Sequence, residues 1–289
     1  MAQLDPYTMD WAEAAARLAR AATDERGWYE AVAGELVRAR DRVAFDVGCG
    51  GAGMTVVLAT VLPEDGRVVA ADHSADVLDA ARAVLAGAGG LRASVDFVRV
   101  DLDRGVDELR AVGPADLVWA SASVHHAGDQ QAAIDALAGL LAPGGRLALV
   151  EGGMKPHHLP WDLGIGEPGL EIRLELAQDR WFTRMRAGLP GSKPMPYGWT
   201  EALRRAGLRE VTTRTWLLDR PVPLSDADRG RVVDSLTKRV ERLDETGLLS
   251  DADLQTWADL LDPAAQTWLG HRDDLYSLEA RSVQLGIAR

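Results

Sequence analysis

A glycine-rich segment after a short apolar run carries the clearest chemical pattern in the chain. It reads Asp46-Val-Gly-Cys-Gly-Gly-Ala-Gly53. Glycine lets a backbone turn sharply after a strand and approach a ligand closely. The spacing Gly48-x-Gly50-x-x-Gly53 also fits a dinucleotide fingerprint, with Asp72 near the position of a ribose-binding acid. The segment by itself therefore leaves an NAD(P)-dependent oxidoreductase open.

The position of Asp46 argues against a dinucleotide. Asp46 stands at the end of the predicted strand, two residues before the first glycine. A pyrophosphate there would face a carboxylate, which is electrostatically unfavourable. A ligand with a cationic amino group would instead be attracted, and S-adenosylmethionine has such an ammonium group and no phosphate. The oxidoreductase is therefore kept as an alternative only.

Short apolar runs alternate with helical segments around this pattern. The expected strands are 43–45, 68–71, 95–100, 116–120 and 147–150, with helices at 53–62, 75–85 and 130–141, the last closed by Pro143-Gly144-Gly145. This alternation is typical of an α/β fold, with a parallel sheet covered by helices on both faces. Ligands bind at the carboxyl ends of the strands in such sheets.

The segments outside this alternation predict additional helices and strands. Before it, we expect helices at 10–22 and 26–38. After residue 151, we expect helices at 170–186 and 199–206, a strand at 209–218, two helices capped by Ser225 and Ser250, and a last strand at 278–287.

Five ordered segments resemble the motifs of class I, Rossmann-like S-adenosylmethionine-dependent methyltransferases of the small-molecule type. The resemblance covers about residues 40–151, and the segments are Phe45–Gly50, Asp72–Leu78, Asp101–Asp103, Asp116–His126 and Leu141–Leu147. It implies a central, mostly parallel sheet with helices on both faces and an added helical lid. Within one domain, it implies N-terminal helices over the cofactor site (1–40), a cofactor-binding core (41–151) and an acceptor-binding excursion with late strands (152–289).

The resemblance assigns cofactor contacts to the first and fourth strands. Gly48, Cys49 and Gly50 would lie along the methionine part of S-adenosylmethionine, with Asp46 near its ammonium group. Ser121 would sit beside the same part, at the end of the fourth strand. A structural role for Cys49 is an equal alternative, because small buried residues suit tight turns.

Further contacts are assigned after the second and third strands. Asp72 would accept hydrogen bonds from both ribose hydroxyls, and His73 would flank the adenine. Asp101 would accept a hydrogen bond from the adenine amino group, with the Leu102 backbone nearby. An Asp after a strand also often caps a helix, which is the structural alternative for Asp101.

Three residues near the fourth and fifth strands are candidates for proton transfer. A histidine is suited to removing a proton near neutral pH, and His125 and His126 follow the fourth strand while Glu151 ends the fifth. By resemblance to O-methyltransferases of this family, one histidine is the general base and Glu151 orients it or the substrate. We take His126 first. The alternative is that both histidines only start a helix or pack.

No metal site is expected. A second pair, His157-His158, lies in the excursion, but adjacent residues of an extended segment point to opposite sides and no spaced ligand motif is present.

Composition bounds the class of protein. The 289 residues carry a formal net charge of −12, which disfavours nucleic acid and anionic membranes as partners, and the one cysteine allows no intramolecular disulfide. Without a secretion signal or a membrane-spanning run, we expect a cytoplasmic enzyme.

Methyl transfer to a small molecule is the expected function, first to a hydroxyl oxygen and second to nitrogen or carbon. Specialised biosynthesis is the expected setting, and a homodimer is one option for assembly. The other alternative is a protein that binds S-adenosylmethionine without methylating, because a fold does not determine function.

Overall fold

The computed structural model describes residues 10–289, and its contacts divide them into two compact units. We call residues 10–152, 190–215 and 282–289 the core unit, and residues 153–189 and 216–281 the accessory unit. All of the predicted cofactor and catalytic residues belong to the core unit.

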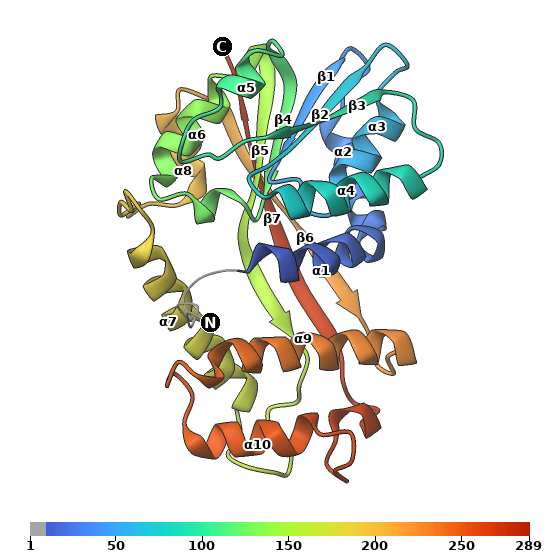
Figure 1. Cartoon of the computed structure of the whole chain (residues 1–289), viewed down its shortest axis with the longest axis vertical. Helices are drawn as coiled ribbons and strands as arrows, with labels where there is room; N and C mark the ends of the chain where they lie inside the picture. Colours follow the sequence, from blue (N-terminus) through green and yellow to red (C-terminus); the bar gives the residue numbers. More distant parts are fainter. Residues whose placement is uncertain (1–9) are drawn as a thin grey trace. The chain divides into compact units, whose positions relative to one another are not determined.

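Seven strands form one sheet in the order β3-β2-β1-β4-β5-β7-β6 (Figure 1). The pairs β1–β2, β2–β3, β1–β4 and β4–β5 are parallel. The strands are β1 (Val43–Val47), β2 (Arg67–Asp72), β3 (Ser94–Arg99), β4 (Ala115–Ser121), β5 (Leu141–His157), β6 (Arg209–Arg220) and β7 (Ser277–Ile287). The predicted Rossmann-like α/β fold is confirmed, with its strand order reversing at β1.

Helices cover both faces of the parallel strands in the core unit (Figure 1), with α2, α3 and α4 on one side and α5, α6 and α8 on the other. The helices of this unit are α1 (Trp11–Asp24), α2 (Arg26–Leu36), α3 (Gly53–Val61), α4 (Ala75–Gly87), α5 (Asp107–Arg110), the 3-10 helix η1 (Val124–His126), α6 (Gln130–Ala138) and α8 (Trp199–Arg205).

The central strands read as apolar runs because both of their faces are buried. In β2, the residues from Val68 to Ala71 are fully buried, and in α3 every residue from Gly53 to Ala59 is buried. A helix that is apolar all round belongs in an interior. The sheet and α3 together therefore hold the glycine-rich loop between β1 and α3 on a rigid base.

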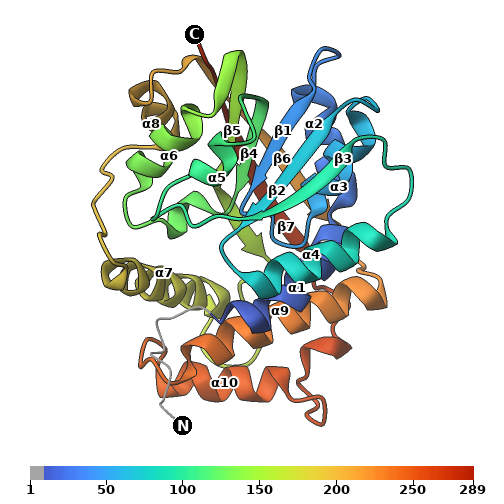
Figure 2. The ribbon, with the colours of Figure 1, turned by 45° about the horizontal axis from the view of Figure 1, so that its top comes forward.

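The accessory unit contains α7 (Leu170–Gly188), α9 (Asp226–Asp244), α10 (Asp251–Leu261) and the 3-10 helix η2 (Leu269–His271) (Figure 2). Ser225 and Ser250 cap α9 and α10 as predicted, because each hydroxyl accepts a hydrogen bond from the backbone N–H three residues later, at 3.1 Å. No helix among residues 10–289 is long and apolar enough to cross a membrane.

Strand β5 differs most from its prediction, because it extends beyond 147–150 in both directions. The segment 143–145 lies within β5 instead of closing a helix. Its pairing with β4 shifts register between Ala115 and Leu117, and Gly144 adopts a φ of +75°. The glycines therefore form an irregularity inside the strand. In the sequence, the same glycines resemble the end of a helix.

Candidate active site

The predicted site residues lie where the strand order reverses. Asp46 is the penultimate residue of β1, Asp72 is the last residue of β2, and Ser121 is the last residue of β4. Glu151 lies in β5, directly after the residue that pairs with Ser121. In open α/β sheets this edge is the ligand-binding edge. The sheet therefore brings together residues that are up to about a hundred positions apart in the chain.

The glycine-rich loop is tightly constrained. Gly48 and Gly50 have φ angles of +71° and +51°, which side chains rarely adopt. The N–H groups of Gly48 and Cys49 both donate to the Ala71 carbonyl, at 2.8 and 2.9 Å. A Cβ at Gly48 would lie 2.3 Å from the Cβ of Ser123. The first glycine is therefore required by both the backbone turn and the close approach of the loop after β4.

Asp46 is a buried carboxylic acid, 2% exposed, whose Oδ2 accepts a hydrogen bond from the Thr55 hydroxyl at 2.5 Å. Burial raises its pKa to about 7, and the nearby Asp72 carboxylate acts in the same direction, while the hydrogen bonds from Thr55 oppose them. Because Thr55 lies in the first turns of α3, the helix that follows the glycines also orients the acid that precedes them.

Asp72 is held by the backbone on both sides of it. Its Oδ2 accepts from Gly50 N–H at 3.3 Å, and its Oδ1 accepts from Ser74 N–H at 3.1 Å. His73 Nδ1 lies 3.2 Å from the same Oδ1. The Trp11 ring of α1 meets the His73 ring edge to face, with 4.8 Å between centroids.

These residues fit S-adenosylmethionine. The ligand offers an ammonium group and two ribose hydroxyls as donors. The buried carboxyl groups of Asp46 and Asp72 are matching acceptors. The glycines at positions 48 and 50 have no side chain that would keep the ligand away from the backbone. A buried acid with a raised pKa is stabilised in its charged form by a cation. A pyrophosphate would instead increase the repulsion between negative charges.

The other assigned contacts differ in how far their surroundings support a ligand role. Cys49 is buried, and burial raises the pKa of its thiol well above its usual range. Asp101 uses both oxygens within its own turn, where Oδ1 accepts from Asp103 N–H at 3.0 Å and Oδ2 pairs with Arg104. Leu102 is partly buried against the main apolar core. The contacts predicted for them, and for Ser121, stay predictions.

Glu151 is the best-satisfied acid of the site. It is 3% exposed, and its Oε1 accepts from the N–H groups of Ser123, Val124 and His125 at 3.0, 2.8 and 3.4 Å. Its Oε2 lies 2.7 Å from His125 Nδ1. Glu151 therefore caps the 3-10 helix η1 and at the same time orients one imidazole ring.

Glu151 contacts His125, and His126, the first choice for the base from the sequence, lies beside that ring. The two imidazole rings lie 4.2 Å apart between centroids. The His126 ring also meets Trp11 edge to face at 5.2 Å. Trp11 thus contacts a residue predicted beside the adenine, His73, and a residue predicted beside the acceptor.

Sequence reasoning missed three residues that shape this site: Ser123, Thr55 and Trp11. Ser123 also donates its hydroxyl to the Val47 carbonyl at 3.1 Å, which joins the ends of β1 and β4. Trp11 lies far outside the motif region, on the helix α1 that packs on the glycine-rich loop, since a Cβ at Gly51 would lie 2.1 Å from the Leu18 carbonyl oxygen. No sequence pattern marks these contacts, because tertiary packing creates them.

His157 and His158, the second histidine pair, contact different groups. His157 Nε2 lies 3.7 Å from Glu175, whereas His158 Nδ1 lies 3.2 Å from the Tyr276 carbonyl. Across the part of the chain that the structure describes, no group of three or more His, Cys, Asp or Glu side chains could hold a metal ion.

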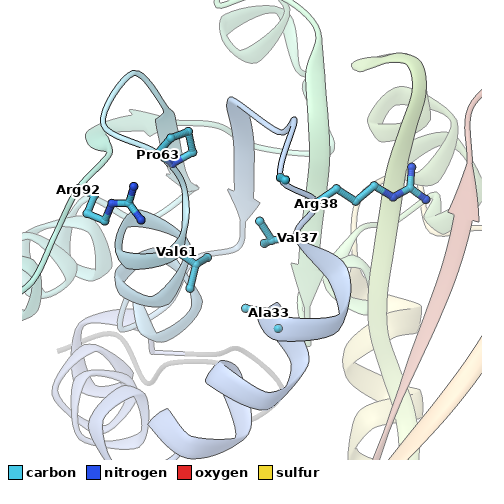
Figure 3. Close-up of a pocket in the computed structure, with 8 residues that line it drawn as sticks. Ala33, Val37, Arg38, Val61, Pro63 and Arg92 are labelled. Carbon is cyan, nitrogen blue, oxygen red and sulfur yellow. The ribbon is translucent and has the colours of Figure 1, made fainter.

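A surface hollow of about 350 Å³ lies on the opposite edge of the sheet (Figure 3). Its lining comes from the segments that precede β1, β2 and β3, including Val37, Pro63 and Arg92. Figure 3 shows the Arg92 side chain directed into the hollow and that of Arg38 directed away from it. This hollow contains none of the predicted site residues.

In a comparison with known protein families, residues 45–147 match the model of the methyltransferase domain family. The chain is 33% identical over 144 residues to trans-aconitate 2-methyltransferase of Methylobacterium radiotolerans, a match that covers 46% of this chain and 51% of that protein. The chain thus matches about half the length of this curated relative.

Solved structures with a similar arrangement are distant in sequence. The structure of a Bacillus halodurans C-125 protein is 17% identical, with a TM-score of 0.49, and the match covers 91% of this chain and 98% of that one. Phosphoethanolamine N-methyltransferase 2 of Haemonchus contortus, in complex with phosphomonomethylethanolamine and S-adenosylhomocysteine, is 15% identical, with a TM-score of 0.47 and coverage of 91% and 52%.

Proposed function

We propose that this protein, whose residues 45–147 match the model of the methyltransferase domain family, is a class I S-adenosylmethionine-dependent methyltransferase that methylates a hydroxyl oxygen of a small molecule, with His125 as the general base. The observation that carries the proposal is the contact between His125 Nδ1 and the buried Glu151, at 2.7 Å. S-adenosylmethionine, when bound, supplies a methyl group activated by its sulfonium. The protein therefore has to position a nucleophile and remove its proton.

The contacts of Glu151 determine the state of His125. A carboxylate that accepts three backbone N–H bonds is held in one orientation, and the remaining oxygen accepts from Nδ1–H. The proton of the neutral ring then lies on Nδ1, and the lone pair lies on Nε2. His125 accepts the proton of the acceptor hydroxyl on Nε2, and Glu151 stabilises the imidazolium that results.

The roles of the remaining residues follow the same scheme. We assign Asp46, Gly48 and Gly50 to the methionine part of the cofactor and Asp72 to its ribose. Residues 152–289 are proposed to bind the acceptor. We take the acceptor to be a small molecule and the reaction to be a cytoplasmic step of specialised biosynthesis. The charge of −12 supports such an acceptor over a nucleic acid.

A carboxylate acceptor is the second candidate, since the matched relative is a trans-aconitate methyltransferase. A carboxylate is already ionised near neutral pH and needs no general base. The two candidates therefore differ in whether turnover depends on His125.

The test is the release of S-adenosylhomocysteine by wild type, His125→Asn and His126→Asn with a panel of hydroxyl-bearing metabolites and with trans-aconitate. We expect turnover of a hydroxyl acceptor to fall by about 10²-fold or more in His125→Asn and to change little in His126→Asn. Calorimetric affinity for S-adenosylmethionine should be unchanged in both. Undiminished turnover by His125→Asn, or turnover of trans-aconitate alone, would refute a His125 base.

A further inference from the structure

Gln284 of β7 is a buried amide without a place in the chemistry described so far. It is 6% exposed, and its Nε2 donates to the Glu151 carbonyl at 3.0 Å, while Glu151 N–H donates to its Oε1 at 3.5 Å. One side chain thus bonds both backbone polar groups of Glu151. Two residues 133 positions apart in the chain are joined where the proposed base is oriented.

We propose that Gln284 is a positioning residue, which holds the Glu151 backbone so that the Glu151 carboxylate keeps His125 in its reactive tautomer. This inference rests on the function proposed above. The Glu151 backbone needs such support because Gly152 and Gly153 follow it with φ angles of +79° and +120°. At these two residues β5 departs from regular strand conformation.

The chemistry of Gln284 favours this role over simple packing. Burying an amide costs free energy unless its hydrogen bonds are satisfied, and an apolar side chain of the same length would fill the space without that cost. The amide offers a donor and an acceptor together, as a neighbouring backbone would. Its neighbour Val283, 3% exposed, points to the other face of the sheet, because successive side chains of a strand alternate.

A displacement of the Glu151 backbone would be transmitted directly to the site. The carboxylate of Glu151 is bonded to Ser123, Val124 and His125, so the acid cannot shift without lengthening one of these bonds. A displacement of about 1 Å in a catalytic group can cost about 10²-fold in rate. We therefore expect Gln284 to affect kcat and not the affinity for the cofactor.

The experiment compares Gln284→Met, which keeps the length and removes the amide, with Gln284→Asn, which withdraws the amide by one methylene. Val283→Ala is the matched control for lost packing on the same strand. The primary readout is the ring tautomer of His125 from long-range ¹⁵N correlation spectra, at a pH where the ring is neutral, with the signals assigned by their loss in His125→Asn. The second readout is kcat against KM for S-adenosylmethionine.

In Gln284→Met we expect His125 to become a mixture of both tautomers, with kcat reduced by about tenfold and KM within twofold. Gln284→Asn should lie between Met and wild type, and it serves as the test if the Met variant does not fold. Val283→Ala should keep the wild-type tautomer. An unchanged tautomer in folded Gln284 variants would overturn the inference, even if His125 proves to be the base. A changed tautomer supports it even if His125→Asn retains full turnover, which would refute the proposed function alone.

Discussion

Asp46 and Glu151 are both buried carboxyl groups at the same edge of the sheet, 2% and 3% exposed, but their surroundings differ. Thr55 is the hydrogen-bonding partner of Asp46, and burial raises the pKa of Asp46 to about 7. Glu151 accepts hydrogen bonds from three backbone N–H groups and contacts an imidazole. Asp46 thus has few hydrogen-bond donors around it, whereas Glu151 has a donor at nearly every lone pair of its carboxylate.

The charge of Asp46 is therefore compensated only in part by hydrogen bonds within the protein, whereas the charge of Glu151 is compensated by several. A buried charge is costly unless donors or an opposite charge compensate it. At Asp46 a cationic ligand would compensate the charge, so the cost of burying this acid would favour ligand binding. At Glu151 the protein itself compensates the charge, and the same hydrogen bonds fix the orientation of the acid towards His125.

The largest effect is expected at Glu151. Glu151→Ala leaves three N–H groups near η1 without their acceptor, and we expect the free energy of unfolding to fall by about 3–5 kcal/mol in urea denaturation. Glu175→Ala is the control, because Glu175 is half-buried and its contact with His157 is 3.7 Å long. That control should lose less than about 1 kcal/mol. Equal losses in the two variants would show that Glu151 is an ordinary acid.

An intermediate effect is expected at Asp46. Asp46→Asn keeps the shape but removes the charge, so the affinity for S-adenosylmethionine in calorimetry should fall by about 1.5–3 kcal/mol, the range for hydrogen bonds to charged groups. The fold should not be destabilised at pH 8, because a costly buried charge is removed. Asp96→Asn, on β3 and paired with Arg67 at the surface, should leave the affinity unchanged. Wild-type affinity in Asp46→Asn would remove Asp46 from the cofactor site.

The two acids also differ in how far the sequence could predict them. Asp46 lies inside a local motif, because a turn after a buried strand needs glycines within a few residues, so its position and role can be inferred from spacing. Glu151 can be placed at the end of a strand in the same way. Its partners cannot, since Ser123 and Gln284 reach it through strand pairing and the path of the chain beyond residue 151.

The difference between local sequence patterns and long-range contacts also explains which helices and strands could be predicted. The alternation of short apolar runs and helical segments predicted the sheet and nearly every helix within a few residues, because strands buried on both faces are continuous apolar runs and helices carry their own period. The short helix α5 (Asp107–Arg110) was missed, since four residues carry no period. The length of β5 was also missed, because glycines inside a strand resemble the glycines that end helices.

The pH dependence of stability, with the smallest change per pH unit, gives the sharpest comparison of the two acids. The pKa of Asp46 is about 7 in the folded protein and near 3.8 in an unfolded chain. Between these values the folded state holds a proton that the unfolded state has lost, so stability should fall as pH rises towards 7 and then level off. The slope is at most about 1.4 kcal/mol per pH unit.

Subtracting the unfolding free energy of Asp46→Asn at each pH isolates this contribution, because the other titrating groups cancel. Saturating S-adenosylmethionine should flatten the difference curve, since a cation beside Asp46 stabilises the carboxylate and lowers its pKa. If the ligand leaves the slope unchanged, its ammonium group does not lie beside Asp46. A flat curve without ligand would mean that Asp46 is compensated within the protein, as Glu151 is, and that the two acids are equivalent.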